Sequence, residues 1–428
     1  MNNLPYSNEK PLIGFFPLFY NLAETGRAVL IAKRYIEHGG QVIFFSHGGE
    51  YEKFPRDLGY KVFKVDPIYS EEFIDDLWKY SRLEKMGAPF TEKILREHVE
   101  AELAAYEKTG VKLILTANNF PCTISARASG IPLISLTPKV IGTFTEYPDD
   151  AEFLLTRFIP KSLKIKILNW YFPRSKMWSR PFNKLAKTYN LPGFYKASDI
   201  TKGDYTLYTD FLELLQLPES EINPSEHYIG PIFLDELFNK TLPKGQSDDI
   251  IKHHLQKPGN SILFSLGSSG KKEFFLKVLK ALNKTNYNVI AVYASVLSED
   301  ELPAVNDNII LKKYVPSIKK LNQSVDLAIL HGGQGTVYTA AYAGKPVIGF
   351  PMQFEQHLNL EMLVKQGTAR IESRRYFKEQ LFLKTIEDVF DNYNFYIKNA
   401  QKLASRLPKP EGDKNAAEIL LEIIDQNM

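Results

Sequence analysis

Short apolar runs, each long enough for one buried strand, recur along the whole chain. The first half carries LIGFFPL, QVIFFSH, YKVFKVD, VKLILTAN and IPLISLTP, and the second half carries SILFSL, YNVIAVYAS, NIILKKYV, VDLAILHGG, PVIGFP and ARIES. Segments with helical spacing, such as GRAVLIAKRYIEHG and TEKILREHVEAELAAYEKTG, separate many of these runs. Because neighbouring parallel strands need a crossover connection, the alternation predicts an α/β protein with two doubly wound units.

Residues 236–258 differ in composition from the units on either side. Pro, Gly, Ser and charged residues accumulate there without an apolar period, as expected for a connector. We therefore predict four parts, namely a first unit over 1–235, a linker over 236–258, a second unit over 259–395 and a C-terminal helical segment over 396–428. The last part contains GDKNAAEILLEIIDQNM, whose apolar residues fall on one helical face and need a surface to cover on one of the units.

The charge balance and the single cysteine limit the classes of partner and compartment. The 53 Lys and Arg residues nearly balance 50 Asp and Glu, so the net charge of +3 gives no global field of the kind that nucleic-acid binding needs. Cys122 has no second cysteine for a disulfide, which fits a reducing compartment. No apolar run approaches about 18 residues, and the start MNNLPYSNEK lacks the features of a signal peptide. We expect a cytoplasmic protein with no nucleic-acid partner.

One segment departs from this charge balance. Residues 153–198 hold ten Lys or Arg residues and no Asp or Glu, interleaved with Trp170, Tyr171, Phe172, Trp178 and Phe182. Such a mixture suits an anionic membrane surface, where each cation contributes about 1 kcal/mol. The segment therefore predicts peripheral contact with the inner face of the membrane. The alternative is a solvated insertion whose aromatic side chains pack inward.

The clearest candidate for chemistry follows a strand of the second half. In VDLAILHGGQGTVYTAAYAGKPVIGFP the strand-like run ends at His331, glycines follow at 332, 333 and 335, and a helix is predicted from about Thr336. Glycines let the backbone approach a ligand, and the free amides at a helix start attract a diphosphate. His331 can add a hydrogen bond or a positive charge. The pattern predicts an anion site; the alternative for HGG alone is an ordinary tight turn.

Other phosphate and metal motifs do not fit the sequence. No Gly-Lys-Ser/Thr follows the glycines, as a P-loop requires, and Tyr338 stands where the dinucleotide pattern needs a third glycine. The chain has no Asp-x-Asp pair, and its eight histidines show no ligand spacing. We therefore predict neither an ATPase nor a dehydrogenase, and no metal site.

A longer pattern surrounds His331. Residues 314–356 contain YVPS, HGGQGT, AGKPVIGFP and FEQ in this order, with SLGSS at 265–269 and HYIGPI at 227–232. The block resembles the nucleotide-sugar-binding signature of glycosyltransferase family 1, the glycosyltransferases related to UDP-glucuronosyl and macrolide transferases. SLGSS and HYIGPI are similar to further parts of that family's sequence. The resemblance implies a GT-B fold, in which an acceptor-binding and a donor-binding Rossmann-like domain face a central cleft.

The resemblance also implies roles for single residues, most of them in donor binding. Tyr314 matches an aromatic residue that stacks on the base, and Val315 matches a residue whose backbone bonds to it. The positions at the diphosphate are Ser268, His331, Gly333, Gly335 and Thr336. The positions at the sugar hydroxyls are Glu355 and Gln356, which also suit the first turn of the helix FEQHLNLEMLVKQ.

Three positions depart from the family pattern. Thr339 stands where a glutamate usually grips the ribose hydroxyls, which leaves the nucleotide base open. Glu24 takes the place of the catalytic histidine in the loop after the first strand, and a carboxylate whose pKa is raised by burial can accept a hydroxyl proton. Asn118 or Asn119 stands where an acidic partner usually orients that histidine. The alternative for Glu24 or Thr25 is an ordinary helix-capping role.

Together these features predict an inverting, metal-independent hexosyltransferase that needs no cofactor. A hydroxyl of a lipid or other hydrophobic acceptor attacks the anomeric carbon, while a nucleoside diphosphate, with UDP expected, leaves into the site around His331 and Thr336. Two alternatives stay open. One is a non-catalytic nucleotide-sugar-binding protein, favoured by the changes at Glu24 and Thr339, and the other is a nucleotide-sugar epimerase.

Overall fold

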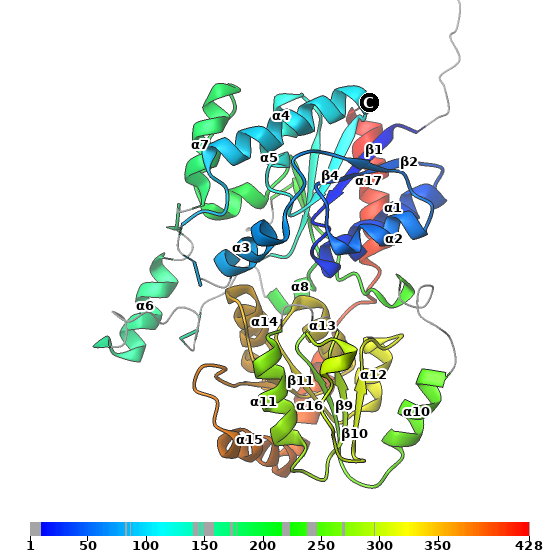
Figure 1. The fold of residues 1–428 in the computed structure, drawn as a ribbon, viewed down its shortest axis with the longest axis vertical. Coiled ribbons are helices and arrows are strands. Elements are labelled where there is room, and N and C mark those ends of the chain that lie inside the picture. The colour runs from blue at the N-terminus through cyan, green and yellow to red at the C-terminus, as the bar shows by residue number, and fades with distance from the viewer. Residues whose placement is uncertain are drawn as a thin grey trace, which may run out of the picture.

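The computed structural model describes residues 10–427, except 82–83, 86, 140–143, 145–146, 149–157, 172–173, 177, 216–222, 238–245, 268–269 and 295. These residues form two parallel sheets that lie one above the other along the longest axis of the molecule (Figure 1). Separate groups of buried apolar side chains lie on the two faces of each sheet, under different helices. The predicted α/β fold class with two doubly wound units is therefore confirmed.

The first sheet has the strand order β3-β2-β1-β4-β5-β6-β7, with every adjacent pair parallel. Its strands are β1 (Leu12–Pro17), β2 (Gln41–Ser46), β3 (Val62–Lys64), β4 (Leu113–Ala117), β5 (Leu133–Thr137), β6 (Tyr205–Tyr208) and β7 (Glu226–Tyr228). Neighbouring side chains of β1 point to opposite faces, so Phe15 packs with α1 (Leu22–Glu37) and Phe16 packs with α4 (Glu92–Thr109) and α5 (Cys122–Ala128). The strand order reverses between β1 and β4, whose carboxyl ends therefore border a crevice.

The second sheet repeats this arrangement with the order β10-β9-β8-β11-β12-β13. Its strands are β8 (Ser261–Ser265), β9 (Asn288–Val292), β10 (Ile309–Lys312), β11 (Leu327–Leu330), β12 (Val347–Gly349) and β13 (Ala369–Ile371). Phe264 packs with α11 (Lys272–Leu282) and α15 (Glu379–Asp391) on one face. Leu330 packs on the other face with α13 (Gln334–Tyr342), α14 (Phe354–Lys365) and α16 (Tyr393–Ala404). The order reverses here between β8 and β11.

The chain returns to the first unit at its C-terminal end. Helix α17 (Gly412–Asn427) lies beside α1, and its Leu420 and Ile423 share one core with Val29 (Figure 1). Arg34 of α1 donates a hydrogen bond of 2.6 Å from Nε to Oδ2 of Asp413. The apolar face predicted for this helix therefore covers the first unit, a choice that the sequence had left open.

Most differences between the predicted and the observed elements concern short segments. Strands β6 and β7 were not predicted, because YTLY and EHY are too short to show a pattern. Helix α10 (Gln246–Leu255) lies within the predicted linker, and its Ile251 packs with Leu263 of the second sheet. The remaining helices are α2 (Lys53–Asp57), α3 (Glu71–Ser81), α6 (Lys161–Tyr171), α7 (Ser179–Thr188), α8 (Leu212–Leu215) and α12 (Ile318–Ser324).

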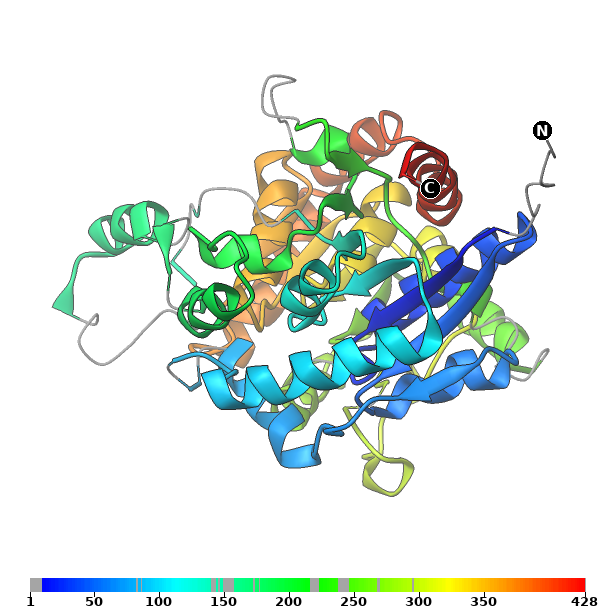
Figure 2. The ribbon, with the colours of Figure 1, turned by 90° about the horizontal axis from the view of Figure 1, so that it is seen from above.

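The basic aromatic segment divides into two helices with different surroundings. In α7, Phe182 is 2% exposed and packs with Trp178 and Phe194. In α6, which stands at the edge of the molecule in Figures 1 and 2, Trp170 is 63% exposed and Tyr171 is also exposed. Phe172 and residues 153–157 lie outside the described residues. The inward-packing alternative therefore holds for α7 and not for α6.

Over the part of the chain that the structure describes, no helix combines the length and apolarity that a membrane crossing requires.

Candidate active site

A cavity of about 260 Å³ lies between the two units. On the first unit it is lined by the start of α1 and by Trp78 of α3, and residues 232–235 line it between the units. On the second unit it is lined by the segments that follow β8, β9, β10, β11 and β12. Ligands of doubly wound sheets bind at the carboxyl ends of the strands, which makes this cavity the candidate site.

Asn21 determines how α1 enters the cavity. Its Oδ1 accepts hydrogen bonds from the backbone nitrogens of Ala23 at 2.9 Å and Glu24 at 3.4 Å, so it is the N-cap of the helix. The helix therefore begins at Leu22, and Glu24 lies in its first turn rather than in the preceding loop. The predicted capping alternative for Glu24 or Thr25 is wrong, since the Thr25 hydroxyl donates to the Leu18 carbonyl instead.

Glu24 is a buried carboxyl group, 6% exposed, at the first-unit side of the cavity. Nδ2 of Asn118, which follows β4, donates a hydrogen bond of 2.9 Å to its Oε1, and Nη1 of Arg27 lies 3.8 Å from the same oxygen. In the part of the chain that the structure describes, Oε2 is buried without a hydrogen-bond partner. Burial raises the pKa of Glu24, and the charge of Arg27 and the bond from Asn118 lower it. Asn119 instead bonds to Glu102 in the core, so Asn118 is the partner of Glu24.

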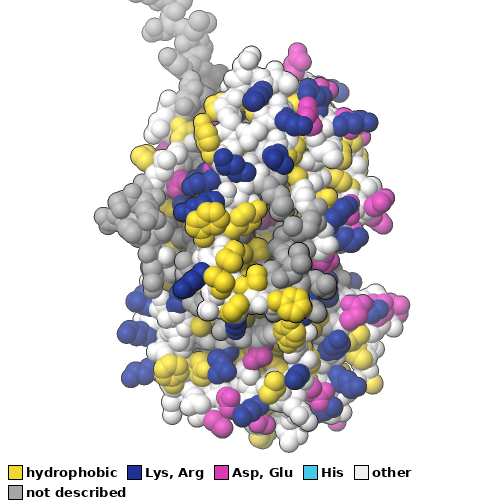
Figure 3. All heavy atoms as spheres, turned by 90° about the vertical axis from the view of Figure 1, so that its left-hand side faces the viewer, with side chains coloured by type: hydrophobic (Ala, Val, Ile, Leu, Met, Phe, Trp, Pro, Cys, Tyr) yellow, Lys and Arg dark blue, Asp and Glu magenta, His cyan; other side chains and the backbone are white. Residues whose placement is uncertain are grey.

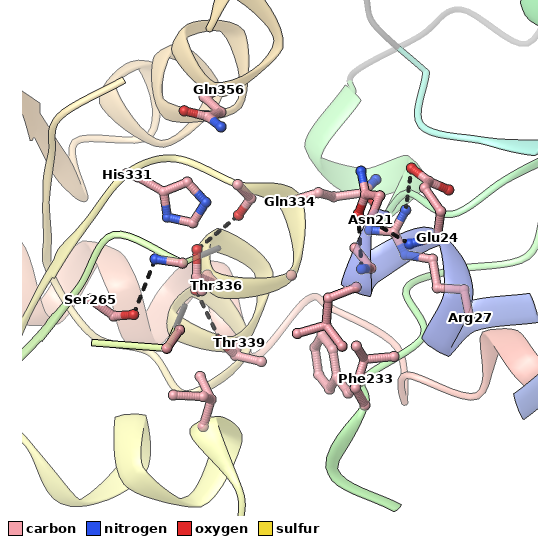
Figure 4. A pocket seen from close by; sticks show the side chains of 18 of the residues that line it. Asn21, Glu24, Arg27, Phe233, Ser265, His331, Gln334, Thr336, Thr339 and Gln356 are labelled. Atoms are coloured by element: carbon pink, nitrogen blue, oxygen red, sulfur yellow. Dashed lines mark hydrogen bonds and ion pairs between the residues drawn. The ribbon is translucent and has the colours of Figure 1, made fainter. Parts of the chain in front are cut away.

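The start of α13 faces Glu24 from the second unit. In Figure 4, His331, Thr336 and Gln356 lie on one side of the cavity and Glu24 and Arg27 on the other. Helix α13 begins at Gln334, two residues before the predicted start, and Gly333 is its N-cap. Apart from its chain neighbours and the helix's own backbone, no atom of the described residues lies within 4 Å of the position that a Cβ on Gly335 would take, so the backbone there is open to a ligand. The first amides of α13 thus offer free donors to an anion.

The His331 ring fits between two glycines. A Cβ on Gly333 would lie 2.3 Å from its Nε2, and a Cβ on Gly267 would lie 2.5 Å from its Cε1. Burial lowers the pKa of His331 to about 4, so the imidazole is neutral at pH 7. Its Nδ1 is buried and has no hydrogen-bond partner among the described residues. Of the two contributions expected from His331, the hydrogen bond is therefore available and the positive charge is not.

The remaining predicted donor residues line the same cavity. They are Tyr314, Val315, Gly333, Gly335, Thr336, Glu355 and Gln356. Oε1 of Glu355 accepts a 2.9 Å bond from Asn359, and Oε1 of Gln356 accepts a 2.8 Å bond from the backbone of Met352, so both side chains also support the start of α14. Burial raises the pKa of Glu355. Ser268 lies outside the described residues.

Thr339 has its hydroxyl group engaged within the second unit. Oγ1 donates to the carbonyl of Thr336 at 2.9 Å and accepts from Nδ2 of Asn322 at 3.0 Å. A carboxylate can accept hydrogen bonds from two ribose hydroxyls, whereas the Thr339 oxygen already accepts one from Asn322 and has at most one lone pair left. Thr339 therefore cannot hold both ribose hydroxyls as a glutamate at this position would.

Several residues at the cavity were missed by sequence reasoning. Arg27 lies three residues after Glu24, and this helical spacing was the one available signal for it. Gln334 was read only as part of HGGQGT, yet its Nε2 donates a 2.8 Å bond to Oδ1 of Asp210, after β6. Tyr338 donates to the same oxygen at 2.7 Å. Asp210 thus ties the start of α13 to the first unit, and nothing local in the sequence marks a contact over that separation.

Within the described residues, no group of three or more His, Cys, Asp or Glu side chains is arranged to hold a metal ion.

Comparisons with known proteins agree with this geometry. Residues 261–418 match the family described as Glycosyltransferase family 28 C-terminal domain. The PGL/p-HBAD biosynthesis rhamnosyltransferase of Mycobacterium bovis is 25% identical over 89% of this chain and 82% of its own length. The UDP-glucuronosyltransferase 2B15 of Rattus norvegicus is 29% identical over 54% of this chain and 42% of its own length.

The fold also matches solved structures. The structure of CalG4, the calicheamicin glycosyltransferase, superposes with a TM-score of 0.66 over 98% of this chain and 99% of that one, at 14% identity. The same two-sheet architecture is thus shared at low sequence identity. Taken with the family match and the named relatives, the GT-B fold supports a glycosyltransferase of the UDP-glucuronosyl and macrolide transferase type, and a hexosyltransferase.

Proposed function

We propose that the protein is an inverting, metal-independent hexosyltransferase. It moves a hexosyl group from a nucleoside-diphosphate sugar, UDP-sugar as the first expectation, to a hydroxyl of a lipid or other hydrophobic acceptor. Residues 1–235 bind mainly the acceptor and residues 259–395 the donor. The observation that carries the proposal is that Glu24 and the start of α13 line one cavity from opposite units. The relatives named as rhamnosyl and UDP-glucuronosyl transferases support the donor class.

The start of α13 receives the diphosphate of the donor. The free amides near Gly335 and the neutral imidazole of His331 are hydrogen-bond donors for the phosphoryl oxygens. The Thr336 hydroxyl donates to the Gly333 carbonyl at 2.9 Å, so it reaches a phosphoryl oxygen only by giving up that bond. Each well-placed donor that strengthens its bond as charge develops is worth about 3 to 4 kcal/mol of barrier. Glu355 and Gln356, from the start of α14, lie where the hydroxyls of the sugar can be held.

Glu24 accepts the proton of the acceptor hydroxyl. As the acceptor oxygen bonds to the anomeric carbon, the bond from that carbon to the diphosphate breaks, and the proton moves to Oε2. Asn118 holds Oε1 and so fixes the direction of the free oxygen. Because base and leaving-group site lie on opposite walls of the cavity, the attack comes from the face opposite the diphosphate, which inverts the configuration.

Helix α6 is the proposed point of contact with the inner face of an anionic membrane. Its apolar side chains Leu163, Ile167, Trp170 and Tyr171 are all exposed, and Phe158 just before it is 91% exposed. Figure 3 shows hydrophobic side chains together on this side of the molecule with Lys and Arg around them. Exposed apolar groups flanked by cations suit the headgroup layer. An acceptor held in a membrane would then reach the cavity from a surface-bound enzyme.

The test is a transfer assay with purified protein and a panel of UDP-, dTDP- and GDP-sugars against long-chain alcohols and glycolipids. We expect release of nucleoside diphosphate together with a glycoside of inverted anomeric configuration, resolved by NMR, at an unchanged rate in EDTA. Donor binding without transfer would favour a binding protein, and an isomerised sugar still attached to its nucleotide would favour an epimerase. Loss of activity with the chelator would contradict the metal-independent step.

A further inference from the structure

The start of α14 carries two residues of the proposed sugar site and is held in part from the other unit. Glu355 and Gln356 lie in its first turn and line the cavity. Gln353 is the N-cap residue, and among the described residues its side chain makes no capping bond to the helix. Its Nε2 instead donates a hydrogen bond of 3.1 Å to Oγ of Ser81, at the end of α3. The first unit therefore takes part in fixing this turn.

Phe144 reaches the same turn from the first unit. It follows β5 in the chain and is 2% exposed. The centre of its ring lies 5.6 Å from the ring centre of Phe354 and 5.6 Å from that of His357. These two residues flank Glu355 and Gln356 in the sequence. Because buried rings pack closely against their neighbours, a shift of Phe144 would displace the first turn of α14.

Asn169 of α6 fixes the backbone of Phe144. Its Oδ1 accepts a hydrogen bond of 2.8 Å from the Phe144 nitrogen, and its Nδ2 donates one of 3.0 Å to the Phe144 carbonyl. A side-chain amide that satisfies both backbone groups of one residue pairs with it as a neighbouring strand would. Phe144 is thus held by the helix that is proposed to contact the membrane, while its ring packs against the second unit.

A second amide clamp of the same kind lies entirely within the first unit. Oδ1 of Asn183, on α7, accepts a 2.7 Å bond from the Phe194 nitrogen, and its Nδ2 donates a 2.8 Å bond to the Phe194 carbonyl. The Phe194 ring packs with Phe182 of the same unit, at 5.9 Å between ring centres. The two clamps share their chemistry and differ in where the ring goes. The contact with α14 therefore distinguishes Phe144 from a residue that only stabilises its own unit.

We propose that Phe144 is a positioning residue that sets the start of α14, and with it Glu355 and Gln356, for the sugar of the donor. The inference rests on the proposed role of these two residues toward the sugar hydroxyls. Hydrogen bonds weaken steeply when their geometry is disturbed, so a displaced first turn holds the sugar less well. The start of α13 is tied to the first unit separately, through Asp210. Loss of the Phe144 contact should therefore affect the sugar and spare the diphosphate.

The test compares Phe144→Ala, Phe144→Leu and Asn169→Ala with wild-type protein by calorimetric binding of UDP-glucose and of UDP. We expect Phe144→Ala and Asn169→Ala to weaken UDP-glucose binding about tenfold, the contribution of one or two hydrogen bonds. UDP binding should stay within about twofold, because UDP lacks the sugar. Phe144→Leu keeps a large apolar side chain against α14 and should recover most of the UDP-glucose affinity.

Hydrogen exchange provides a second measurement that needs no ligand. The backbone nitrogen of His357 donates to the Gln353 carbonyl at 3.0 Å and begins the hydrogen-bonded part of α14. Amides over residues 357–360 should exchange about tenfold faster in Phe144→Ala and Asn169→Ala, because local opening becomes easier when the packing on this turn is lost. Phe144→Leu should exchange there nearly as slowly as wild type.

Asn183→Ala and Phe182→Ala are the matched controls, because they remove a clamp and a buried ring inside the first unit. They should lower the melting temperature and leave the ratio of UDP-glucose to UDP affinity, and the exchange over 357–360, unchanged. An unchanged affinity ratio in Phe144→Ala, or wild-type exchange over 357–360, would overturn the inference. If wild type transferred no sugar, the proposed function would fail, while hydrogen exchange would still decide whether Phe144 fixes the start of α14.

Discussion

Asn118 donates a hydrogen bond of 2.9 Å from Nδ2 to Oε1 of Glu24. The resemblance to glycosyltransferase family 1 implies a histidine at the position of Glu24 and an acid at that of Asn118 or Asn119. The two replacements are complementary, since an amide N–H bonds to a carboxylate, whereas a second carboxylate would repel it. The pair therefore suits the proposed role of Glu24 as the base and of Asn118 as its orienting partner.

Replacing Glu24 by Gln keeps the shape of the side chain and removes the base. We expect the turnover number to fall by about 10² to 10⁴, with donor affinity retained. The base works as a carboxylate, so kcat/KM should decrease as the pH drops through the pKa of Glu24, which burial raises above the ordinary range. This acid limb should be absent from the residual activity of Glu24→Gln. If kcat/KM of Glu24→Gln decreased at low pH in the same way as that of the wild type, the titrating group would be one other than Glu24.

Asn118→Ala provides a finer measurement of the same pair. It removes a hydrogen bond that favours the charged form of Glu24, so the pKa of that carboxyl rises and the acid limb moves to higher pH. An unchanged limb in Asn118→Ala would show that the bond does not govern the base.

The strands and the residues of the proposed donor site could be identified from the sequence because their signals are local. Every apolar run that was predicted to be a strand forms a strand in the structure. His331 and the glycines that follow it are neighbours in the sequence. The start of α1 was also readable, since Asn21 followed three residues later by Glu24 is a capping pattern. The segment GRAVLIAKRYIEHG, which has helical spacing, begins at Gly26, four residues after the observed start at Leu22.

What could not be predicted depends on contacts between distant parts of the chain. The bond from Gln334 to Asp210 spans 124 positions, and neither residue shows it in its own neighbourhood. The destination of α17 is of the same kind, because its apolar face fits any apolar surface until the fold selects α1. The Gln334–Asp210 bond, the packing of α17 on α1 and the position of Arg27 at the cavity all depend on how distant parts of the chain pack together.

Gly335→Ala should separate stability from activity. Alanine favours a helix over glycine by about 1 kcal/mol, and a methyl group at this position meets none of the described residues within 4 Å outside its own helix backbone and chain neighbours. The variant should therefore unfold at equal or higher urea concentration. Its KM for the donor should rise, since the methyl group occupies the space of the diphosphate. Gly333→Ala is the comparison, because its Cβ would collide with His331, so both stability and activity should drop. Wild-type donor affinity in Gly335→Ala would place the diphosphate elsewhere.

His331 should make stability depend on pH in a defined window. Its pKa is lowered from 6.5 to about 4 in the folded protein, so below about pH 6.5 the unfolded chain takes up a proton that the folded chain does not. Stability contributed by the neutral ring is complete above pH 6.5 and is lost as the pH falls to 4, by up to about 3 kcal/mol. His331→Gln lacks this loss. Urea unfolding of both proteins at several pH values measures the difference, and parallel curves would contradict the buried neutral state.

The hydroxyl of Tyr338 should stabilise the junction between the units. It donates a 2.7 Å bond to Asp210, and Tyr338→Phe leaves that buried carboxyl with one donor fewer, at a cost of about 1 to 3 kcal/mol. The double variant with Asp210→Ala should show a coupling energy of similar size in urea unfolding. Tyr342→Phe is the matched control, because Tyr342 stacks on Phe211 from the next turn and is no partner of Asp210 in the described part of the chain. If the effects of Tyr338→Phe and Asp210→Ala on the free energy of unfolding simply added, the hydrogen bond between Tyr338 and Asp210 would contribute nothing to stability.

Helix α6 should bind anionic vesicles through cations and apolar groups together. Lys161 and Lys166 are exposed, whereas Lys164 is buried with Nζ 5.2 Å from the ring centre of Tyr147, so a test based on the sequence alone would include the wrong lysine.

We expect sedimentation with phosphatidylglycerol vesicles at low salt, weakened about fivefold by each of Lys161→Gln and Lys166→Gln. Trp170→Ser should also weaken the binding that persists at high salt, because apolar insertion is not screened. Lys184→Gln, on α7 and paired with Glu92 at 3.6 Å, is the control and should bind as wild type does. Equal binding by neutral vesicles, or none at low salt, would remove the membrane from the proposed function and leave a dissolved hydrophobic acceptor.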